Sequence, residues 1–99
     1  MTSLLVQKSR QTASFFRLLA DPTRYCILSL ILSRPKGMCV YEIAEAADIS
    51  HSAASHQLAR LEDRGIVTSF RIGQSVCYEL NRTCALARQI KRVITSIRS

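Results

Sequence analysis

The fold is decided by the stretch Ile49–Leu61, ISHSAASHQLARL. Ser50 is a preferred N-cap residue, and Ala54, Leu58 and Leu61 then recur at intervals of four and three, which is the spacing of one buried helix face. The opposite face carries short polar side chains and ends in a cation. The stretch therefore predicts a helix that buries one side and exposes a slim polar ridge on the other.

A shorter helix precedes this one. Residues 40–47 read as helical, Asp48 and Ile49 suit a tight turn, and the second helix ends near Gly65, a residue favoured at the left-handed position after a helix. Two helices joined by such a brief turn predict a helix-turn-helix over about residues 40–64.

The period of the apolar residues then changes from 3.6 to 2. Residues 66–72 alternate, Gly73-Gln74 can form a turn, and residues 76–80 alternate again. We expect a β-hairpin, or wing, over about residues 66–80, in which Cys77 faces away from the inward side.

Each end of the chain is expected to form a helix. Residues 4–19 have an apolar face of Leu5, Phe15, Phe16 and Leu19, and a buried helix starts after them at Asp21-Pro22. In residues 82–97 apolar side chains recur at spacings of four, three and four, which is typical of a helix-pairing seam. The whole predicts one mostly α domain over residues 1–99, a winged helix-turn-helix. The apolar face of residues 82–97 must be buried, either against a second protomer or against the protomer's own core.

Charge favours a polyanionic partner. The 99 residues carry fourteen Lys and Arg against seven Asp and Glu, a net charge of +7, which attracts nucleic acid or an anionic surface. The longest apolar run, residues 27–32, is too short to span a bilayer, and the N-terminus lacks the pattern of a signal peptide. We expect a cytoplasmic protein with no membrane partner.

The polar ridge is best explained by contact with DNA. Small hydroxyls, imidazoles and one guanidinium can enter a major groove about 12 Å wide and bond to base edges or phosphates. Two wing residues suit a contact with the backbone or the minor groove, although an ordinary solvated turn is the alternative there. The candidate DNA contacts are His51, Ser52, Ser55, His56, Arg60, Arg71 and Gln74.

Catalysis and metal binding suit the two histidines less well. Ser52 lies four residues before His56, and His51 four before Ser55, but no carboxylate is placed to orient either imidazole. A metal site would need further ligands that the neighbouring sequence lacks. We therefore expect no enzyme, and leave open that single residues of the ridge only cap the helix or face solvent.

Four segments together resemble the ArsR/SmtB repressors: LADPTRYCILSLIL, MCVYEIAEAADIS, HSAASHQLARLEDRGIV and GQSVCYEL. The resemblance implies a homodimer that binds double-stranded operator DNA and leaves it when a metal, metalloid or thiol reagent binds. It also implies that the first and last helices form the dimer interface. The expected interface residues are Phe15, Leu86, Ile90, Val93 and Ile97.

The residues at the family's two metal-binding sites differ in this chain. Members that bind metal near the helix-turn-helix carry C-V-C-D-L, where this chain has Cys39-Val40-Tyr41-Glu42-Ile43. The other family site uses Asp, His and Glu on the last helix, and residues 81–99 contain none of these.

The four cysteines are expected to be thiols rather than a disulfide framework. As a hypothesis, Cys39 joined by Cys77 or Cys84 senses a soft metal(loid) or an oxidant such as a persulfide, while Cys26 packs as a small hydrophobe. The alternative is that each thiol is an ordinary packed or surface residue. No other cofactor is expected.

The sequence as a whole predicts a sequence-specific DNA-binding repressor. The alternative is a protein-interaction module that keeps the winged-helix scaffold without the DNA activity.

Overall fold

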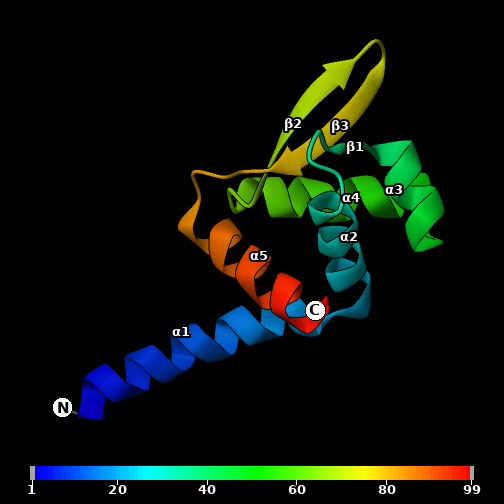
Figure 1. Ribbon diagram of the computed structural model, residues 1–99. Helices are drawn as coiled ribbons and strands as arrows, with labels where there is room; N and C mark the ends of the chain where they lie inside the picture. Colours follow the sequence, from blue (N-terminus) through cyan, green and yellow to red (C-terminus); the bar gives the residue numbers. More distant parts are fainter. Residues whose placement is uncertain (1, 99) are drawn as a thin grey trace.

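A computed structural model describes residues 2–98 as five helices and a three-stranded sheet (Figure 1). The elements are α1 (Thr2–Ala20), α2 (Pro22–Leu32), β1 (Met38–Cys39), α3 (Val40–Ala47), α4 (His51–Asp63), β2 (Val67–Ile72), β3 (Ser75–Leu80) and α5 (Ala85–Arg98). The architecture is mostly α with a hairpin wing, which confirms the predicted winged helix-turn-helix. None of the described helices is long and apolar enough to cross a membrane.

The helix boundaries follow from their capping residues. Asp21 Oδ2 accepts a 2.8 Å hydrogen bond from the Arg24 backbone N–H, and Ser50 Oγ accepts one of 3.0 Å from the Ala53 N–H. These bonds satisfy amides that have no partner inside the first turn of a helix. Asp48 has a φ of 57°, so it makes the sharp turn between α3 and α4.

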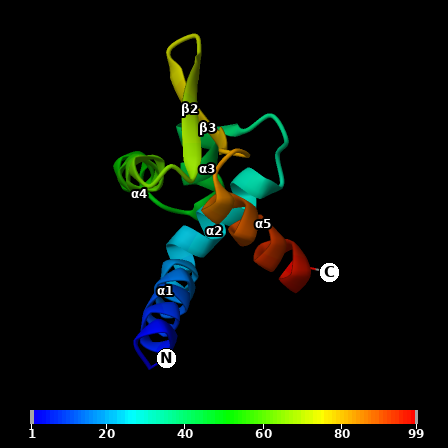
Figure 2. The ribbon, with the colours of Figure 1, turned by 90° about the vertical axis from the view of Figure 1, so that its left-hand side faces the viewer.

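The wing is a regular antiparallel hairpin. β2 pairs with β3 from Val67–Leu80 at its base to Ile72–Ser75 at its tip, and Gly73 in the two-residue turn has a φ of 60°. The tip extends well beyond the helices (Figures 1 and 2). The half nearer the helices is anchored in the core, where Val67, Cys77 and Tyr78 are buried.

The strand β1 is a feature that sequence analysis missed. It pairs with the other edge of β3, with Met38 opposite Tyr78 and Cys39 opposite Cys77, so the strand order is β1-β3-β2. Cys77 is therefore fully buried, and the prediction that it faces away from the inward side is wrong. β1 thus covers the outer edge of β3, and the helices α2 and α3 also contact this strand.

The core is built from one face of each of α2, α3, α4 and α5. Its largest fully buried side chains are Ile27, Leu28, Ile31, Ile43, Leu58, Leu61, Ile66, Val67, Cys77, Ile90 and Ile94. In α5 the buried face is Ala87, Ile90 and Ile94, and Arg98 Nη2 donates a 3.1 Å bond to Ser29 O of α2. The prediction that Ile90 meets a partner protomer is wrong, because this side chain already fills the protomer's own core.

Candidate nucleic-acid interface

Helix α4 is oriented by its buried residues. Ala54, Leu58 and Leu61 are completely or almost completely buried against the core, and α4 packs closely on α3. At about 100° per residue, the opposite side of the helix is centred on Ser52 and His56. This rotation exposes the polar ridge that the sequence predicts.

The predicted residues of α4 reach solvent. His51, Ser52, His56 and Arg60 are exposed, and Ser55 is half-buried. Ser52 lies 3.4 Å, Oγ to Oγ, from the capping Ser50, whereas neither imidazole makes a hydrogen bond within residues 2–98.

The wing completes this surface on one side of α4. A groove lies between the start of α4, the start of α3 and the outer part of the hairpin, and it brings Gln74 beside His51 and Ser55. Arg71 is exposed on β2 and lies outside this groove. The full lining is Val40, Tyr41, His51, Ser55, Gln74, Ser75, Val76 and Tyr78.

Tyr41 is a member of this groove that sequence analysis did not single out. Its side chain is 57% exposed although it follows the buried Val40 at the start of α3. Its position in the first turn of the helix-turn-helix could have indicated this role, because a tyrosine there lies beside the polar ridge of the second helix. A phenol there can hydrogen-bond a phosphate or stack on a sugar.

The inner wall of the groove carries a neutral phenol. Burial raises the pKa of Tyr78, and the Glu62 carboxylate raises it further by repelling a phenolate. Glu62 is itself tied to the wing, since its Oε2 accepts a 2.6 Å hydrogen bond from Ser69 Oγ. The groove thus offers hydrogen-bonding groups without a buried charge.

The geometry gives no support to catalysis or to a metal at the two histidines. Across residues 2–98 no three His, Cys, Asp or Glu side chains gather closely enough to hold a metal ion. Within the same residues no carboxylate orients His51 or His56.

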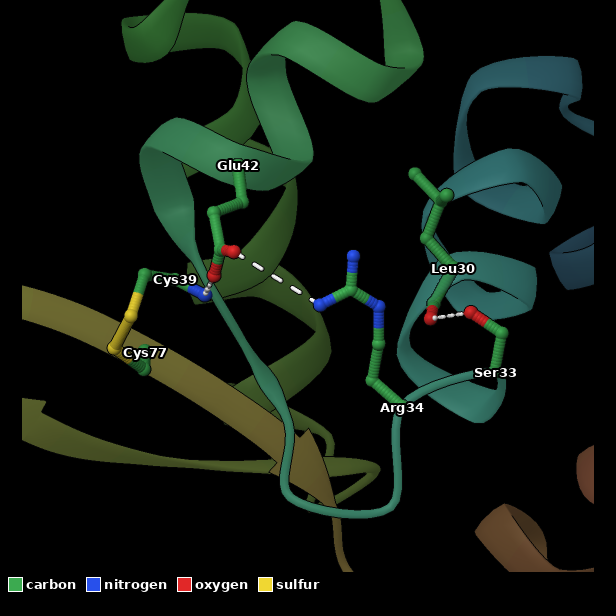
Figure 3. Close-up of polar contacts among 6 residues, drawn as sticks. All are labelled: Leu30, Ser33, Arg34, Cys39, Glu42 and Cys77. Atoms are coloured by element: carbon green, nitrogen blue, oxygen red, sulfur yellow. Dashed lines mark hydrogen bonds and ion pairs between the residues drawn. A yellow bond between two sulfur atoms is a disulfide. The ribbon is translucent and has the colours of Figure 1, made fainter.

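The cysteines depart from expectation. Cys39 and Cys77 are joined by a disulfide across β1 and β3, so the prediction of four free thiols is wrong for this pair (Figure 3). The reason is the unpredicted strand β1, which places the two residues directly opposite each other. Cys39 is buried, whereas Cys26 and Cys84 are free and half-buried. The structure therefore joins Cys39 with Cys77 and leaves Cys84 outside the pair.

The disulfide lies at the beginning of α3, next to a small polar network. Glu42 Oε1 accepts a 2.9 Å bond from the Cys39 N–H, and its Oε2 lies 3.9 Å from Arg34 Nη1 (Figure 3). The carboxylate thus links the loop after α2 to the first turn of α3.

The end helices expose apolar side chains. The outer part of α1 extends away from the body of the molecule (Figures 1 and 2), and Leu4, Leu5 and Phe16 are 70%, 67% and 59% exposed. Of the predicted interface residues, Ile97 is exposed, while Phe15, Leu86 and Val93 are half-buried. Phe15 and Val93 line one groove between α1 and α5.

The sequence is similar to those of known bacterial transcriptional regulators. Residues 21–69 match the sequence model of the arsR family of bacterial regulatory proteins. The chain is 36% identical over 87 residues to a transcriptional repressor SmtB homolog from Synechocystis, covering 86% of this chain and 64% of that protein. It is 32% identical over 82 residues to the HTH-type transcriptional regulator YgaV from Escherichia coli, covering 81% and 82%.

A solved structure shows the same fold. The crystal structure of a predicted DNA-binding transcriptional regulator from E. coli superposes with a TM-score of 0.77 at 24% identity, covering 99% of this chain and 97% of that chain. The chain spans slightly less than two thirds of the SmtB homolog's length.

Proposed function

The chain belongs to the ArsR family of bacterial transcriptional regulators, and from this premise we propose that it is a homodimeric repressor that binds operator DNA in the cytoplasm. The observation that carries the proposal is the exposed ridge of α4, flanked on one side by the groove under the wing. A helix with a small polar ridge can enter the major groove and bond to base edges.

Each part of this surface has a distinct role in the proposal. Ser52, His56 and Arg60 contact base edges or nearby phosphates from the ridge. His51, Ser55 and Gln74, together with Tyr41, contact the backbone beside it. Arg71 on the exposed wing contacts the backbone or the minor groove.

Dimerisation rests on the apolar side chains of the end helices. Phe15, Leu86, Val93 and Ile97 face a second protomer in this proposal, together with Leu4, Leu5 and Phe16 of α1. Of these, Phe15, Phe16 and Val93 line one groove, and grouped exposed apolar side chains are typical of an interaction surface. A twofold dimer then requires a near-palindromic operator, with one half read by each α4.

Selection of duplexes from a random pool tests DNA recognition. The purified protein should enrich a near-palindromic sequence, and Ser52→Ala or His56→Ala should weaken binding to it by about 1–3 kcal/mol for each lost base contact. Ser96→Ala, at an exposed serine of α5, is the matched control and should bind as the parent does. Enrichment of no sequence would contradict the proposal and favour the protein-interaction module.

We further propose that a redox signal acts through Cys39 and Cys77. The disulfide connects the start of α3 to β3, and the neighbouring residues Val40, Val76 and Tyr78 line the groove. Closing the bond fixes the wing against α3 and removes its freedom to adjust to DNA. The oxidised form therefore releases the operator.

The chemistry of this signal balances with a persulfide as the oxidant. The two thiols give up two electrons and two protons as the S–S bond forms, and the persulfide is reduced to a thiol and hydrogen sulfide. The donor set does not fit a three-thiolate metal(loid) site, since the described residues place no third ligand beside the pair.

Single cysteine variants test the redox proposal. Cys39→Ser and Cys77→Ser should keep operator binding when a persulfide releases the parent. Cys84→Ser and Cys26→Ser should still respond. Release of Cys77→Ser by persulfide, or release of the parent by arsenite alone, would contradict the redox proposal.

A further inference from the structure

A pocket with four arginines lies on the flank of α4 that faces away from the wing. Arg17 comes from α1, Arg24 from α2, and Arg60 and Arg64 from α4. Residues 57 and 64 are about 160° around the helix from residues 55 and 62, which face the wing. The pocket is thus separate from the groove under the hairpin.

No acidic side chain lines this pocket, and none of the four guanidinium groups forms an ion pair with any residue from 2 to 98. Arg24 is held in place, since its Nε donates a 2.7 Å bond to Leu18 O and its Nη2 a 3.2 Å bond to Arg17 O at the end of α1. The side chains of Arg17, Arg60 and Arg64 are exposed and make no hydrogen bond to a described residue. Four gathered cations repel one another until an anion neutralises them.

A second observation concerns Gln57, which lines the same pocket. Its Oε1 is buried and has no hydrogen-bond partner among the described residues. Buried amide groups are normally satisfied, and a carboxamide can turn either its oxygen or its NH2 group toward a ligand. The pocket therefore combines excess positive charge with an unused hydrogen-bonding group.

We propose that Arg17, Arg24, Arg60 and Arg64 form a phosphate-binding site, and that it holds a phosphodiester of the operator backbone. Guanidinium groups match the geometry of phosphate oxygens. The assignment to DNA rests on the proposed function: when the ridge of α4 enters the major groove, this flank faces the strand opposite the one that the wing approaches. A free phosphate has the same chemistry, and the test separates the two sources.

The test uses the double variant Arg17→Gln/Arg64→Gln, which removes two exposed side chains that make no hydrogen bond or ion pair to a described residue. The control, Arg82→Gln/Lys91→Gln, removes the same charge from exposed positions outside the pocket. Operator affinity is measured against salt for both variants and the parent. The log–log slope should become less steep by about 1 per lost phosphate contact in the pocket variant, with equal weakening on a scrambled duplex, and remain near the parent value in the control.

A second measurement compares the melting temperature of each protein in inorganic phosphate and in chloride at equal ionic strength. An anion that binds the native state raises this temperature, and the control retains any general effect of phosphate on stability. A changed slope with an unchanged phosphate effect assigns the site to DNA. An unchanged slope with a lost phosphate effect assigns it to a free phosphate.

If the pocket variant matches the control in both measurements, the site is overturned. If the parent binds no DNA, the proposed function fails, and the melting comparison alone decides the phosphate site.

Discussion

Ser69 Oγ of β2 donates a hydrogen bond of 2.6 Å to Oε2 of Glu62 on α4. It is a direct side-chain hydrogen bond between the hairpin and the helix that reads DNA in our proposal. This exposed contact therefore helps to orient the wing relative to α4, beside the pairing of β3 with β1 and the Cys39–Cys77 disulfide. The bond can be removed without disturbing the core.

Removing this hydroxyl is expected to affect DNA binding more than folding. Ser69→Ala should lower the free energy of unfolding by only about 0.5–1.5 kcal/mol, because the bond is exposed, and weaken operator binding several-fold as the wing loses its orientation. Thr68→Ala, at the exposed neighbour, is the control and should bind normally. Denaturant titration and fluorescence anisotropy measure the two effects. Equal affinities for the two variants would show that the bond does not position the wing.

His56 and Arg71 are expected to contribute differently to DNA binding. Arg71→Ala should reduce affinity for operator and scrambled duplexes equally, because a wing contact with the backbone carries little sequence information. His56→Ala should lower the ratio of specific to non-specific affinity, because it removes a base contact in our proposal. Parallel titrations with both duplexes measure that ratio. The same ratio in both variants would contradict this division of roles.

Gly37 is expected to be the least replaceable glycine. It has a φ of +85°, and a Cβ there would lie 2.5 Å from Tyr78 O, whereas Gly73 has a φ of +60° with open space around it. Gly73→Ala should cost about 1–2 kcal/mol for the left-handed backbone, and Gly37→Ala a further 1–3 kcal/mol for the close contact. Chemical denaturation compares the two. Similar losses would show that the loop moves away from β3 without cost.

Substitutions in the end helices are expected to affect either dimerisation or folding, according to whether the side chain is exposed or buried. Phe16→Ser and Ile97→Ser change exposed side chains and should weaken the dimer while the protomer stays folded, because these groups contact little within it. Ile94→Ala should cost about 2–5 kcal/mol of stability, because that side chain is fully buried. Sedimentation at micromolar concentration together with circular dichroism distinguishes the outcomes. Dimers of unchanged affinity in both surface variants would place the interface elsewhere.

Tyr78 is expected to make the fold sensitive to alkaline pH. Because burial and Glu62 raise its pKa above the ordinary value near 10, the native state keeps a proton that the unfolded chain has lost. Its contribution is complete below about pH 10 and disappears as the pH rises through the raised pKa. Tyr78→Phe should flatten this part of the profile, and Tyr41→Phe, at an exposed tyrosine, should not. A steep loss that remains in Tyr78→Phe would assign it to another group.

Local patterns explain why so much of the fold could be predicted. Asp21 and Ser50 cap helices, Gly65 and Gly73 take left-handed conformations, and each of these depends on neighbours in sequence. The exposed ridge of α4 follows in the same way, since the buried positions of a helix determine which residues face outward.

The parts that could not be predicted depend on contacts between distant segments. The two residues of β1 are too few to show a period, and the strand exists only because β3 is beside it, 38 residues later at the cysteine pair. The burial of Cys77 and its bond to Cys39 follow from that pairing. The arginine pocket is formed by residues of three helices, α1, α2 and α4. The prediction for Ile90 was wrong because helical spacing does not show which of two neighbouring faces of α5 packs against the core.

The exposure of α1 means that the stability of this helix should depend on the proposed dimerisation. Residues 3–14 of this helix are exposed in a single protomer, and an isolated helical segment of this length is only marginally stable in water. If the proposed dimer covers these turns, they should unwind before the rest of the domain when the protomers separate, and their amide protons should exchange faster at nanomolar than at micromolar concentration. The helical content of α1 should then increase with the concentration of the protein.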